Sequence, residues 1–126
     1  MLSFLIADDS RDKIVMLRHM LKRAQWKGDV LTAKTTDEAK ELIDAHPDIA
    51  AAFIDYYIPS ENGPAVIAFL KQRCPACRIA LVSSADNADN AARAKAAGAE
   101  AAICTTHRSD FVEREILGLL EAWMAS

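Results

Sequence analysis

Residues 50–63 read AAAFIDYYIPSENG. Five apolar residues precede Asp55, and Pro59 and Gly63 follow it at intervals of four residues. A short apolar run bounded by turn-forming residues is typical of a strand buried on both faces, and proline and glycine favour a loop after it. We therefore expect a strand over Ile49–Asp55 that ends in a carboxylate, and a loop that ends at Gly63.

The same alternation of a short apolar segment with an amphipathic segment occurs five times along the chain. The other strands are expected at Leu2–Ala7, Val30–Ala33, Arg78–Ser83 and Ala99–Cys104. The helices are expected at Arg11–Gln25, at Asp37–Ala45 with Thr36 as N-cap, from Pro64 onward, at Asp86–Ala97, and from a cap at Ser109 or Asp110 to Met124. Apolar strands that alternate with helices belong to a parallel sheet covered on both faces. The predicted fold class is α/β, a flavodoxin-like doubly wound sheet of five parallel strands in the order 2-1-3-4-5 within three α/β/α layers.

The bulk properties of the chain limit its organisation and its partners. Its 126 residues suit one core, so we expect a single domain over residues 1–126. The formal net charge is -3 and no basic stripe is present, so we expect no direct contact with nucleic acid. No stretch is long and apolar enough for a membrane span, and the first residues, MLSFLIADDS, lack the cationic region of a signal peptide. We therefore expect a cytoplasmic location and no membrane contact.

The three cysteines fit a reducing compartment better than a disulfide framework. Cys74 and Cys77 form a Cys-Pro-Ala-Cys pair between an expected helix and an expected strand. A redox pair of this spacing normally opens a helix, and a structural zinc ion would need two more ligands nearby. We interpret the pair as an ordinary loop.

Carboxylates follow two of the expected strands. Asp8 and Asp9 come directly after the first strand, and Asp55 ends the third. In the order 2-1-3-4-5 these strands are neighbours, and ligands of open parallel sheets bind beyond the carboxyl ends of the strands where the order reverses. Converging carboxylates repel one another unless a cation or a shared proton compensates. Mg2+ prefers oxygen ligands, so we expect a Mg2+ site here, at which a carboxylate can act as the nucleophile of phosphoryl transfer.

Three features together carry a resemblance to a known family. They are the acidic pair Asp8-Asp9, the Asp-x-x-x-Pro-x-x-x-Gly arrangement of Asp55–Gly63, and Ser83 at the end of the fourth strand. The sequence resembles the response-regulator receiver domains of two-component signalling over nearly its whole length. This resemblance implies that the hydroxyl of Ser83, or of its neighbour Ser84, hydrogen-bonds the phosphoryl group.

The resemblance also assigns roles to the acidic residues. It implies that Asp55 is the phosphoacceptor, phosphorylated by a histidine kinase or a phosphotransfer protein. It further implies that Asp8 and Asp9 bind Mg2+, the second of them directly, and that Asp55 and the backbone carbonyl of Tyr57 complete the protein ligands.

Two positions depart from the family pattern. Counting from Gly98-Ala99, Thr105 stands where the family has a lysine, so this position offers a hydroxyl but no charge to the phosphoryl oxygens. The switch aromatic of the family aligns with Ala102, which has no ring to move inward. We therefore expect an atypical receiver domain with a weakened switch, in which His107 or Arg108 either replaces the missing charge or is a solvated loop residue.

The last helix has a wider apolar face than packing on a core requires. It consists of Val112, Ile116, Leu119, Leu120 and Trp123, widened by Leu117 and Met124. The surplus is either a contact surface or packing under the carboxyl end of the chain itself. The resemblance implies that the fourth helix, fifth strand and last helix form an output surface for an effector protein or an attached output domain, and a homodimer is one form of that contact.

The function expected from these observations is that of a phosphoacceptor in a two-component phosphorelay. It involves no enzyme activity beyond self-directed phosphotransfer and autodephosphorylation. The alternative is a phosphorylation-independent, receiver-like protein-interaction module, which Thr105 and Ala102 favour and the acidic cluster opposes. A phosphatase with an Asp-x-Asp nucleophile is disfavoured because Tyr57 stands two residues after Asp55. A flavin carrier is disfavoured because the carboxylates after the first strand would repel the cofactor phosphate.

Overall fold

The chain forms a single five-stranded parallel sheet with helices on both faces. The computed structural model describes residues 2–125. The strands are β1 (Ser3–Ala7), β2 (Asp29–Ala33), β3 (Ile49–Ile54), β4 (Arg78–Ser83) and β5 (Ala101–Cys104). The helices are α1 (Arg11–Arg23), α2 (Thr36–Ala45), α3 (Gly63–Arg73), α4 (Ala88–Ala97) and α5 (Ser109–Ala125). The sheet order is β2-β1-β3-β4-β5, so the predicted flavodoxin-like α/β fold is confirmed.

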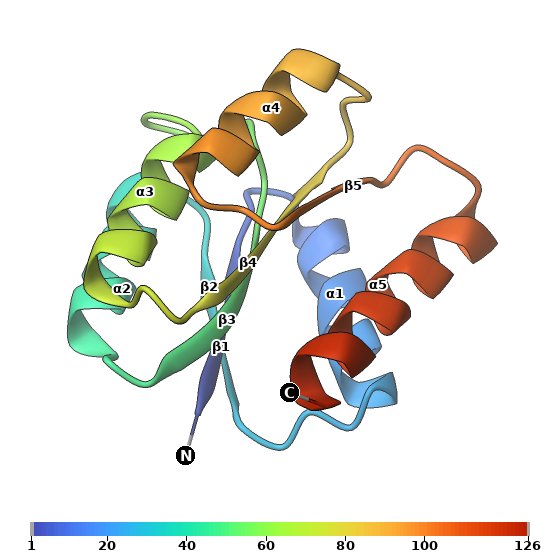
Figure 1. Cartoon of the computed structure of the whole chain (residues 1–126), viewed down its shortest axis with the longest axis horizontal. Coiled ribbons are helices and arrows are strands. Elements are labelled where there is room, and N and C mark those ends of the chain that lie inside the picture. Colours follow the sequence, from blue (N-terminus) through green and yellow to red (C-terminus); the bar gives the residue numbers. More distant parts are fainter. Residues whose placement is uncertain (1, 126) are drawn as a thin grey trace.

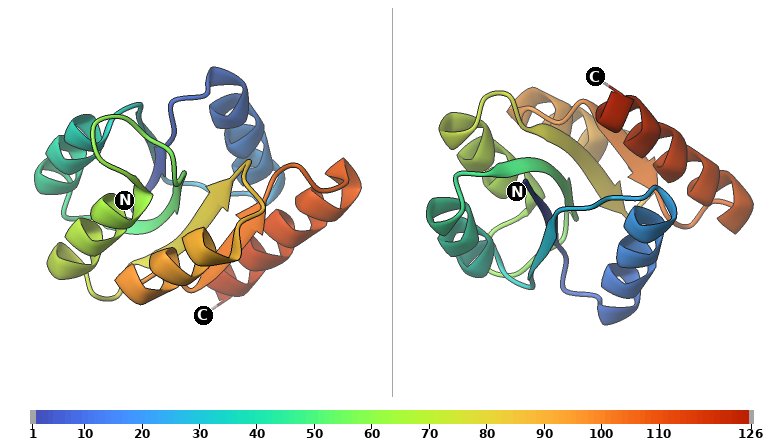
Figure 2. Two further views of the ribbon diagram at one scale, coloured as in Figure 1. Left: turned by 90° about the horizontal axis from the view of Figure 1, so that it is seen from above. Right: turned by 90° about the horizontal axis from the view of Figure 1, so that it is seen from below.

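Three layers result from this connectivity. Helices α2, α3 and α4 cover one face of the sheet, and α1 and α5 cover the other (Figures 1 and 2). Each face has its own core. Small and aliphatic side chains make up most of the core on the α2, α3 and α4 side, whereas the core on the α1 and α5 side contains a cluster of phenylalanine and tryptophan rings. No helix within residues 2–125 has the length and apolarity that a membrane crossing requires.

The predicted bounds of several elements were wrong by one to two residues, and the helix caps explain two of these errors. Thr35, not Thr36, caps α2, and its side chain accepts a hydrogen bond from the backbone N of Glu38 at 3.0 Å. The fourth helix begins at Ala88 instead of Asp86, because Asn87 is its cap. The cap is the residue whose side-chain oxygen reaches the free backbone N–H groups of the first turn. At both sites two residues that can serve as caps are adjacent, Thr35-Thr36 and Asp86-Asn87, so the sequence does not distinguish between them.

The remaining differences lie at other ends of elements. Helix α1 ends at Arg23 rather than Gln25, which has a left-handed backbone with φ of 66°. Strand β5 begins at Ala101 rather than Ala99, and Ser109, one of the two predicted caps, is the first residue of α5 instead. Strands β1, β2 and β3 each differ from the prediction by one residue at one end. These shifts leave the order and type of the elements unchanged.

The loop after β3 is held against the end of that strand. Thr36, which is buried inside the first turn of α2, donates its backbone N–H to the carbonyl of Pro59 at 2.6 Å, and its hydroxyl accepts a hydrogen bond from the N–H of Glu61 at 3.3 Å. A Cβ atom at Gly63 would lie 2.2 Å from the carbonyl oxygen of Asp55. Glycine is therefore required for the loop to return so close to β3.

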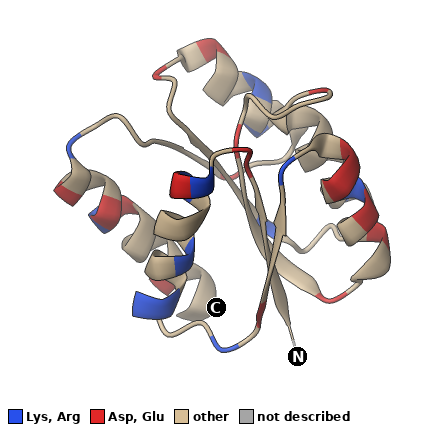
Figure 3. Cartoon of the chain, turned by 180° about the vertical axis from the view of Figure 1, so that it is seen from behind, with Lys and Arg blue, Asp and Glu red and all other residues tan. Residues whose placement is uncertain are grey.

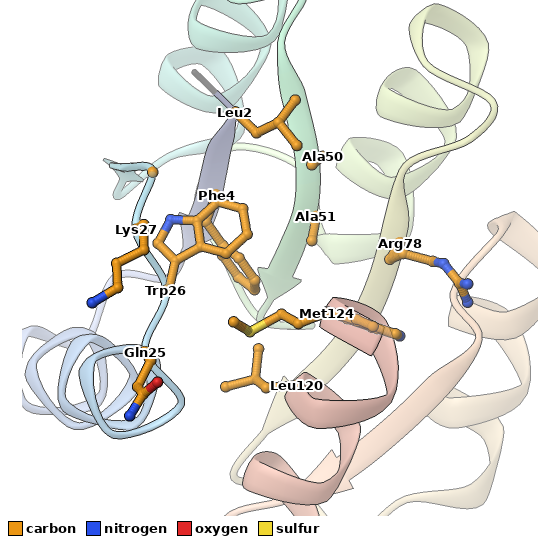
Figure 4. Close-up of a pocket in the computed structure, with 12 residues that line it drawn as sticks. Leu2, Phe4, Gln25, Trp26, Lys27, Ala50, Ala51, Arg78, Leu120 and Met124 are labelled. Carbon is orange, nitrogen blue, oxygen red and sulfur yellow. The ribbon is translucent and has the colours of Figure 1, made fainter. Parts of the chain in front are cut away.

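An aromatic cluster surrounds Phe4, near the amino end of β1. The ring of Phe4 lies 5.5 Å from the ring of Trp26, 4.9 Å from Phe53 and 6.2 Å from Trp123, measured between centroids. An apolar cavity of about 420 Å³ opens beside this cluster, between the end of α1, the end of α5 and the sheet (Figure 4). Met124 is among the residues that line this cavity, and most of the others are apolar as well.

Candidate functional site

The acidic residues singled out in the sequence lie together at the carboxyl ends of β1 and β3. These two strands are hydrogen-bonded neighbours, and the N–H of Asp55 continues their ladder by donating to the carbonyl of Ala7 at 2.9 Å. Asp8 is 1% exposed and Asp55 is 7% exposed, whereas Asp9 is exposed. Carboxylate oxygens of Asp8, Asp9 and Asp55 all lie within 4.8 Å of one another. The structure therefore brings together the three carboxylates that the sequence analysis expected to converge.

A fourth residue, Lys13, belongs to this site and was missed in the sequence. Its Nζ lies 2.8 Å from Oδ2 of Asp8 and 3.2 Å from Oδ1 of Asp55, and its side chain is only 10% exposed. Lys13 stands on the first turn of α1, whose N-cap Ser10 accepts a hydrogen bond from its backbone N at 3.3 Å. The feature of the sequence that could have indicated Lys13 is the short connection between Asp9 and the start of α1. This connection holds the first turn of α1 close to the carboxyl ends of the strands.

Burial dominates the electrostatics of Asp8. Loss of hydration raises the pKa of the Asp8 carboxyl above its usual value, the ion pair with Lys13 opposes this shift, and the charge of Asp55 adds to it. Oδ1 of Asp8 also accepts a hydrogen bond from the N–H of Ser10 at 2.9 Å. Two buried carboxylates thus share one ammonium group, and the cluster keeps an excess of negative charge.

The donor set fits a hard divalent cation. Three carboxylates supply oxygen ligands, and the exposed Asp9 leaves one side of the cluster open to water, as Mg2+ prefers. The excess negative charge favours such an ion. However, two of the three carboxylates also bind Lys13, so an incoming cation would meet the ammonium group at these two residues.

The β4 side of the site carries hydroxyl groups. Ser83 is 2% exposed at the end of β4, and its hydroxyl accepts a hydrogen bond from the N–H of Ala85 at 3.3 Å. Thr105 donates its backbone N–H to the Ser83 carbonyl at 2.9 Å, and its hydroxyl lies 3.4 Å from the same oxygen. Position 105 is therefore bound to the end of β4, with a neutral side chain.

The side chain of Tyr57, whose backbone carbonyl is the expected ligand, points toward α4. Its hydroxyl accepts a hydrogen bond from Nδ2 of Asn90 at 2.9 Å, and 57% of the residue is exposed. Tyr56 contacts it edge to face at 5.0 Å between ring centroids. The loop that follows the acidic strand is thus connected to α4.

The two candidates for a replacement cation after β5 have other partners. His107 Nε2 lies 3.3 Å from Oδ2 of Asp86, and a guanidinium nitrogen of Arg108 lies 3.1 Å from Asp110. The side chain of Arg108 is 85% exposed. These residues form surface pairs, so the cation that contacts the carboxylates comes from α1 instead.

The distribution of charge agrees with this description. Lysine and arginine are scattered over the helices and loops, and acidic and basic segments meet where α1 begins (Figure 3). No basic stripe of the kind that binds nucleic acid runs over the described residues in this view.

The family assignment follows from comparison with known sequences. The family model for the response regulator receiver domain matches residues 4–111. The chain belongs to this family. Receiver domains are signalling modules rather than enzymes in general. A search of curated protein sequences finds no match.

Solved structures of receiver domains share the fold. The Mn2+-bound form of the response regulator Rcp1 is 13% identical with a TM-score of 0.84, and the match covers 100% of this chain and 96% of that chain. A response regulator from Burkholderia pseudomallei with a phosphorylated aspartic acid, a calcium ion and citrate is 22% identical with a TM-score of 0.75, covering 99% of this chain and 74% of that one. A probable two-component response regulator and GGDEF domain protein is 25% identical with a TM-score of 0.77, covering 98% of this chain and 50% of that one.

Proposed function

We propose that residues 1–126 form a single receiver domain that accepts a phosphoryl group on Asp55 from a histidine kinase or a phosphotransfer protein. The observation that carries this proposal is the buried Asp55 carboxylate at the end of β3, with oxygens of Asp8 and Asp9 within 4.8 Å. Among the described residues, Lys13 is the basic side chain that forms an ion pair with Asp55. The neighbouring carboxylates repel Asp55, so the structure of the fold does not require a charge at this position. We further propose a cytoplasmic location.

The chemistry assigned to Asp55 is nucleophilic. Its free oxygen attacks phosphorus, a phosphorus–oxygen bond forms, the phosphorus–nitrogen bond of a phosphohistidine donor breaks, and the electron pair leaves with the imidazole. Oδ1 of Asp55 is oriented by the N–H of Tyr56 at 2.8 Å. The hydroxyl of Ser83 is the proposed hydrogen-bond donor to the phosphoryl oxygens, and Thr105 adds polarity without charge.

We assign Mg2+ to Asp8, Asp9, Asp55 and the carbonyl of Tyr57. When bound, the ion supplies positive charge next to the transferred phosphoryl group. The residues of the chain do the rest: the strand ladder fixes Asp55, the N–H of Ser10 orients Asp8, and the exposed Asp9 leaves the cluster accessible. Autodephosphorylation is the only hydrolytic reaction that we expect from this site.

The proposed output surface is formed by α4, β5 and α5. A hollow of about 320 Å³ lies there, lined among others by Ser83, Asp86, Ala102 and Phe111. Phe111 is 48% exposed, whereas Val112 and others of the apolar face of α5 are buried against the sheet. An effector protein or an attached output domain is the expected partner, and a second copy of the chain would use the same surface.

Intact mass spectrometry tests the proposal. The protein is incubated with Mg2+ and phosphoramidate, and an Asp55→Asn variant serves as the isosteric control. We expect one phosphoryl addition that requires Mg2+ and is absent from the variant. Addition that persists in Asp55→Asn would place the phosphoacceptor elsewhere and contradict the assignment.

A phosphorylation-independent interaction module is the second candidate. It is favoured by Thr105, which brings no charge to the β5 side, and by Lys13, which already compensates part of the charge of the carboxylates. Such a module would show no phosphoryl addition under the conditions above, while still binding its partner through α4, β5 and α5.

A further inference from the structure

The carboxylate cluster contains its own cation. Within residues 2–125, Lys13 is the basic residue that forms ion pairs with Asp8 and Asp55. Its ammonium group is largely removed from water, since only a tenth of the side chain is exposed. Burying an ammonium group is costly unless it is paired, so the position of Lys13 is determined by the two carboxylates that it bridges.

The same two carboxylates are the proposed ligands of a divalent ion. A cation bound by Asp8 and Asp55 uses carboxylate oxygens at the strand ends, and Lys13 Nζ lies within 3.2 Å of one oxygen of each residue. A divalent ion and an ammonium group that share both carboxylates also repel each other. Asp9 is different, because it is exposed and no ion pair with Lys13 is found for it.

From this geometry we propose that Lys13 is a built-in counter-cation that competes with the divalent ion for Asp8 and Asp55. The inference rests on the metal site of the proposed function. An incoming ion meets Asp9 first and then displaces the ammonium group from the two buried carboxylates. Lys13 thereby lowers the affinity of the site for the metal and holds the first turn of α1 on the strand ends when the metal is absent.

The fold allows this exchange without a rearrangement of the backbone. Lys13 lies three residues after the cap Ser10, whose oxygen is bonded to the Lys13 backbone N rather than to its side chain. The flexible four-carbon stem lets the ammonium group move while the helix start stays in place. Once displaced, the ammonium group remains near Asp55 and can add positive charge to that of the ion beside a phosphoryl group there, whereas Thr105 has no charge to offer.

The test measures binding of Mn2+ alone, by electron paramagnetic resonance of the free ion, without any phosphoryl donor. The wild-type protein is compared with Lys13→Met, Lys13→Gln and the control Lys22→Met. Lys22 is exposed on the same helix, so the control removes the same charge from α1 outside the site. Circular dichroism verifies that each variant is folded. Two different replacements of Lys13 are used so that the result does not depend on the side chain that is introduced.

We expect both Lys13 variants to bind Mn2+ about tenfold more tightly than the wild type, because a nearby like charge and a competitor are removed together. Lys22→Met is expected to change the affinity less than about twofold, because exposed distant charges are screened. Unchanged or weaker binding by the folded Lys13 variants would overturn the inference.

A further variant, Asp9→Asn, separates this inference from the proposed function. If Mn2+ binding is lost in Asp9→Asn but does not depend on Lys13, the metal site stands and the competition is wrong. If neither the wild type nor the Lys13 variants bind Mn2+, the metal site itself fails and the inference fails with it. Tighter binding in the Lys13 variants that still requires Asp9 supports both.

Discussion

Near the amino end of β1, the ring of Phe4 packs against Phe53 of β3 and Trp123 of α5, whereas at the carboxyl ends of β1 and β3 the carboxylates of Asp8 and Asp55 are buried beside Lys13 of α1. The two ends belong to the same strands. Burial of aromatic surface stabilises the fold, and burial of a carboxylate excess costs free energy. The comparison indicates that aromatic packing at the apolar end stabilises the fold, whereas burial of the carboxylates at the charged end destabilises it. The following substitutions test this difference.

The largest effect is expected from Phe4→Ala. Phe4 is 1% exposed and contacts three other aromatic rings, so its removal leaves a space that joins the apolar cavity beside it. We expect a loss of about 3–5 kcal/mol in the free energy of unfolding, measured by urea denaturation followed by circular dichroism. A loss below about 1 kcal/mol would mean that the aromatic end is not the main source of stability.

At the charged end, Gly63→Ala is expected to destabilise the fold by about 2–3 kcal/mol, because the new Cβ meets the Asp55 carbonyl oxygen at 2.2 Å. Gly118→Ala is the matched control, because a Cβ added in the middle of α5 meets no atom within 4 Å apart from its chain neighbours and the backbone of its own helix. The control should gain about 1 kcal/mol from helix propensity. Equal effects at both glycines, again in urea denaturation, would show that the loop after β3 relaxes easily.

Asp8→Asn is expected to stabilise the metal-free protein at neutral pH. Burial raises the pKa of Asp8 in the folded state, so ionisation of Asp8 favours unfolding above that pKa. Lys13 keeps Asp55 as its partner in this variant.

The gain should shrink as the pH falls through the raised pKa of Asp8. It should vanish below the ordinary pKa of 3.8, where Asp8 is protonated in both states. Urea denaturation in EDTA at several pH values measures it. A variant that is less stable than the wild type at neutral pH would show that the Lys13 pair outweighs the cost of burial.

The smallest effect concerns the thiols near the amino end of β4. Burial raises the pKa of Cys77 to about 12, with the nearby Cys74 adding to the shift. At pH 8 we therefore expect iodoacetamide to modify the half-buried Cys74 well before Cys77, as measured by peptide mass spectrometry. Equal labelling of the two cysteines in the folded protein would show that this end opens locally.

Hydrophobic periodicity was sufficient to predict the type and order of the elements along the chain. The sheet order was taken from the doubly wound fold class, and the convergence of Asp8, Asp9 and Asp55 was predicted from that order. The bounds were less predictable. A choice between Thr35 and Thr36 depends on which hydroxyl reaches the free N–H groups of α2, and this is a property of the backbone path.

Lys13 could not be assigned in the same way. A lysine on an amphipathic helix is usually solvated, and only the close approach of the first turn of α1 to the strand ends turns it toward Asp8 and Asp55. The interpretation of His107 and Arg108 as solvated residues agrees with their surface pairs. Patterns in the sequence thus predicted which carboxylates form the site. The identification of Lys13 as their counter-cation required the three-dimensional structure.

The aromatic end of the molecule has a spectroscopic consequence. The chain contains two tryptophans, and both Trp26 and Trp123 line the cavity at the amino ends of the strands. Neither indole lies at the carboxylate cluster. Intrinsic fluorescence should therefore report solvent entry and unfolding at the apolar end. A change in emission on adding Mg2+ would indicate that ion binding alters the packing of Trp123 on Phe53, which lies two residues before Asp55.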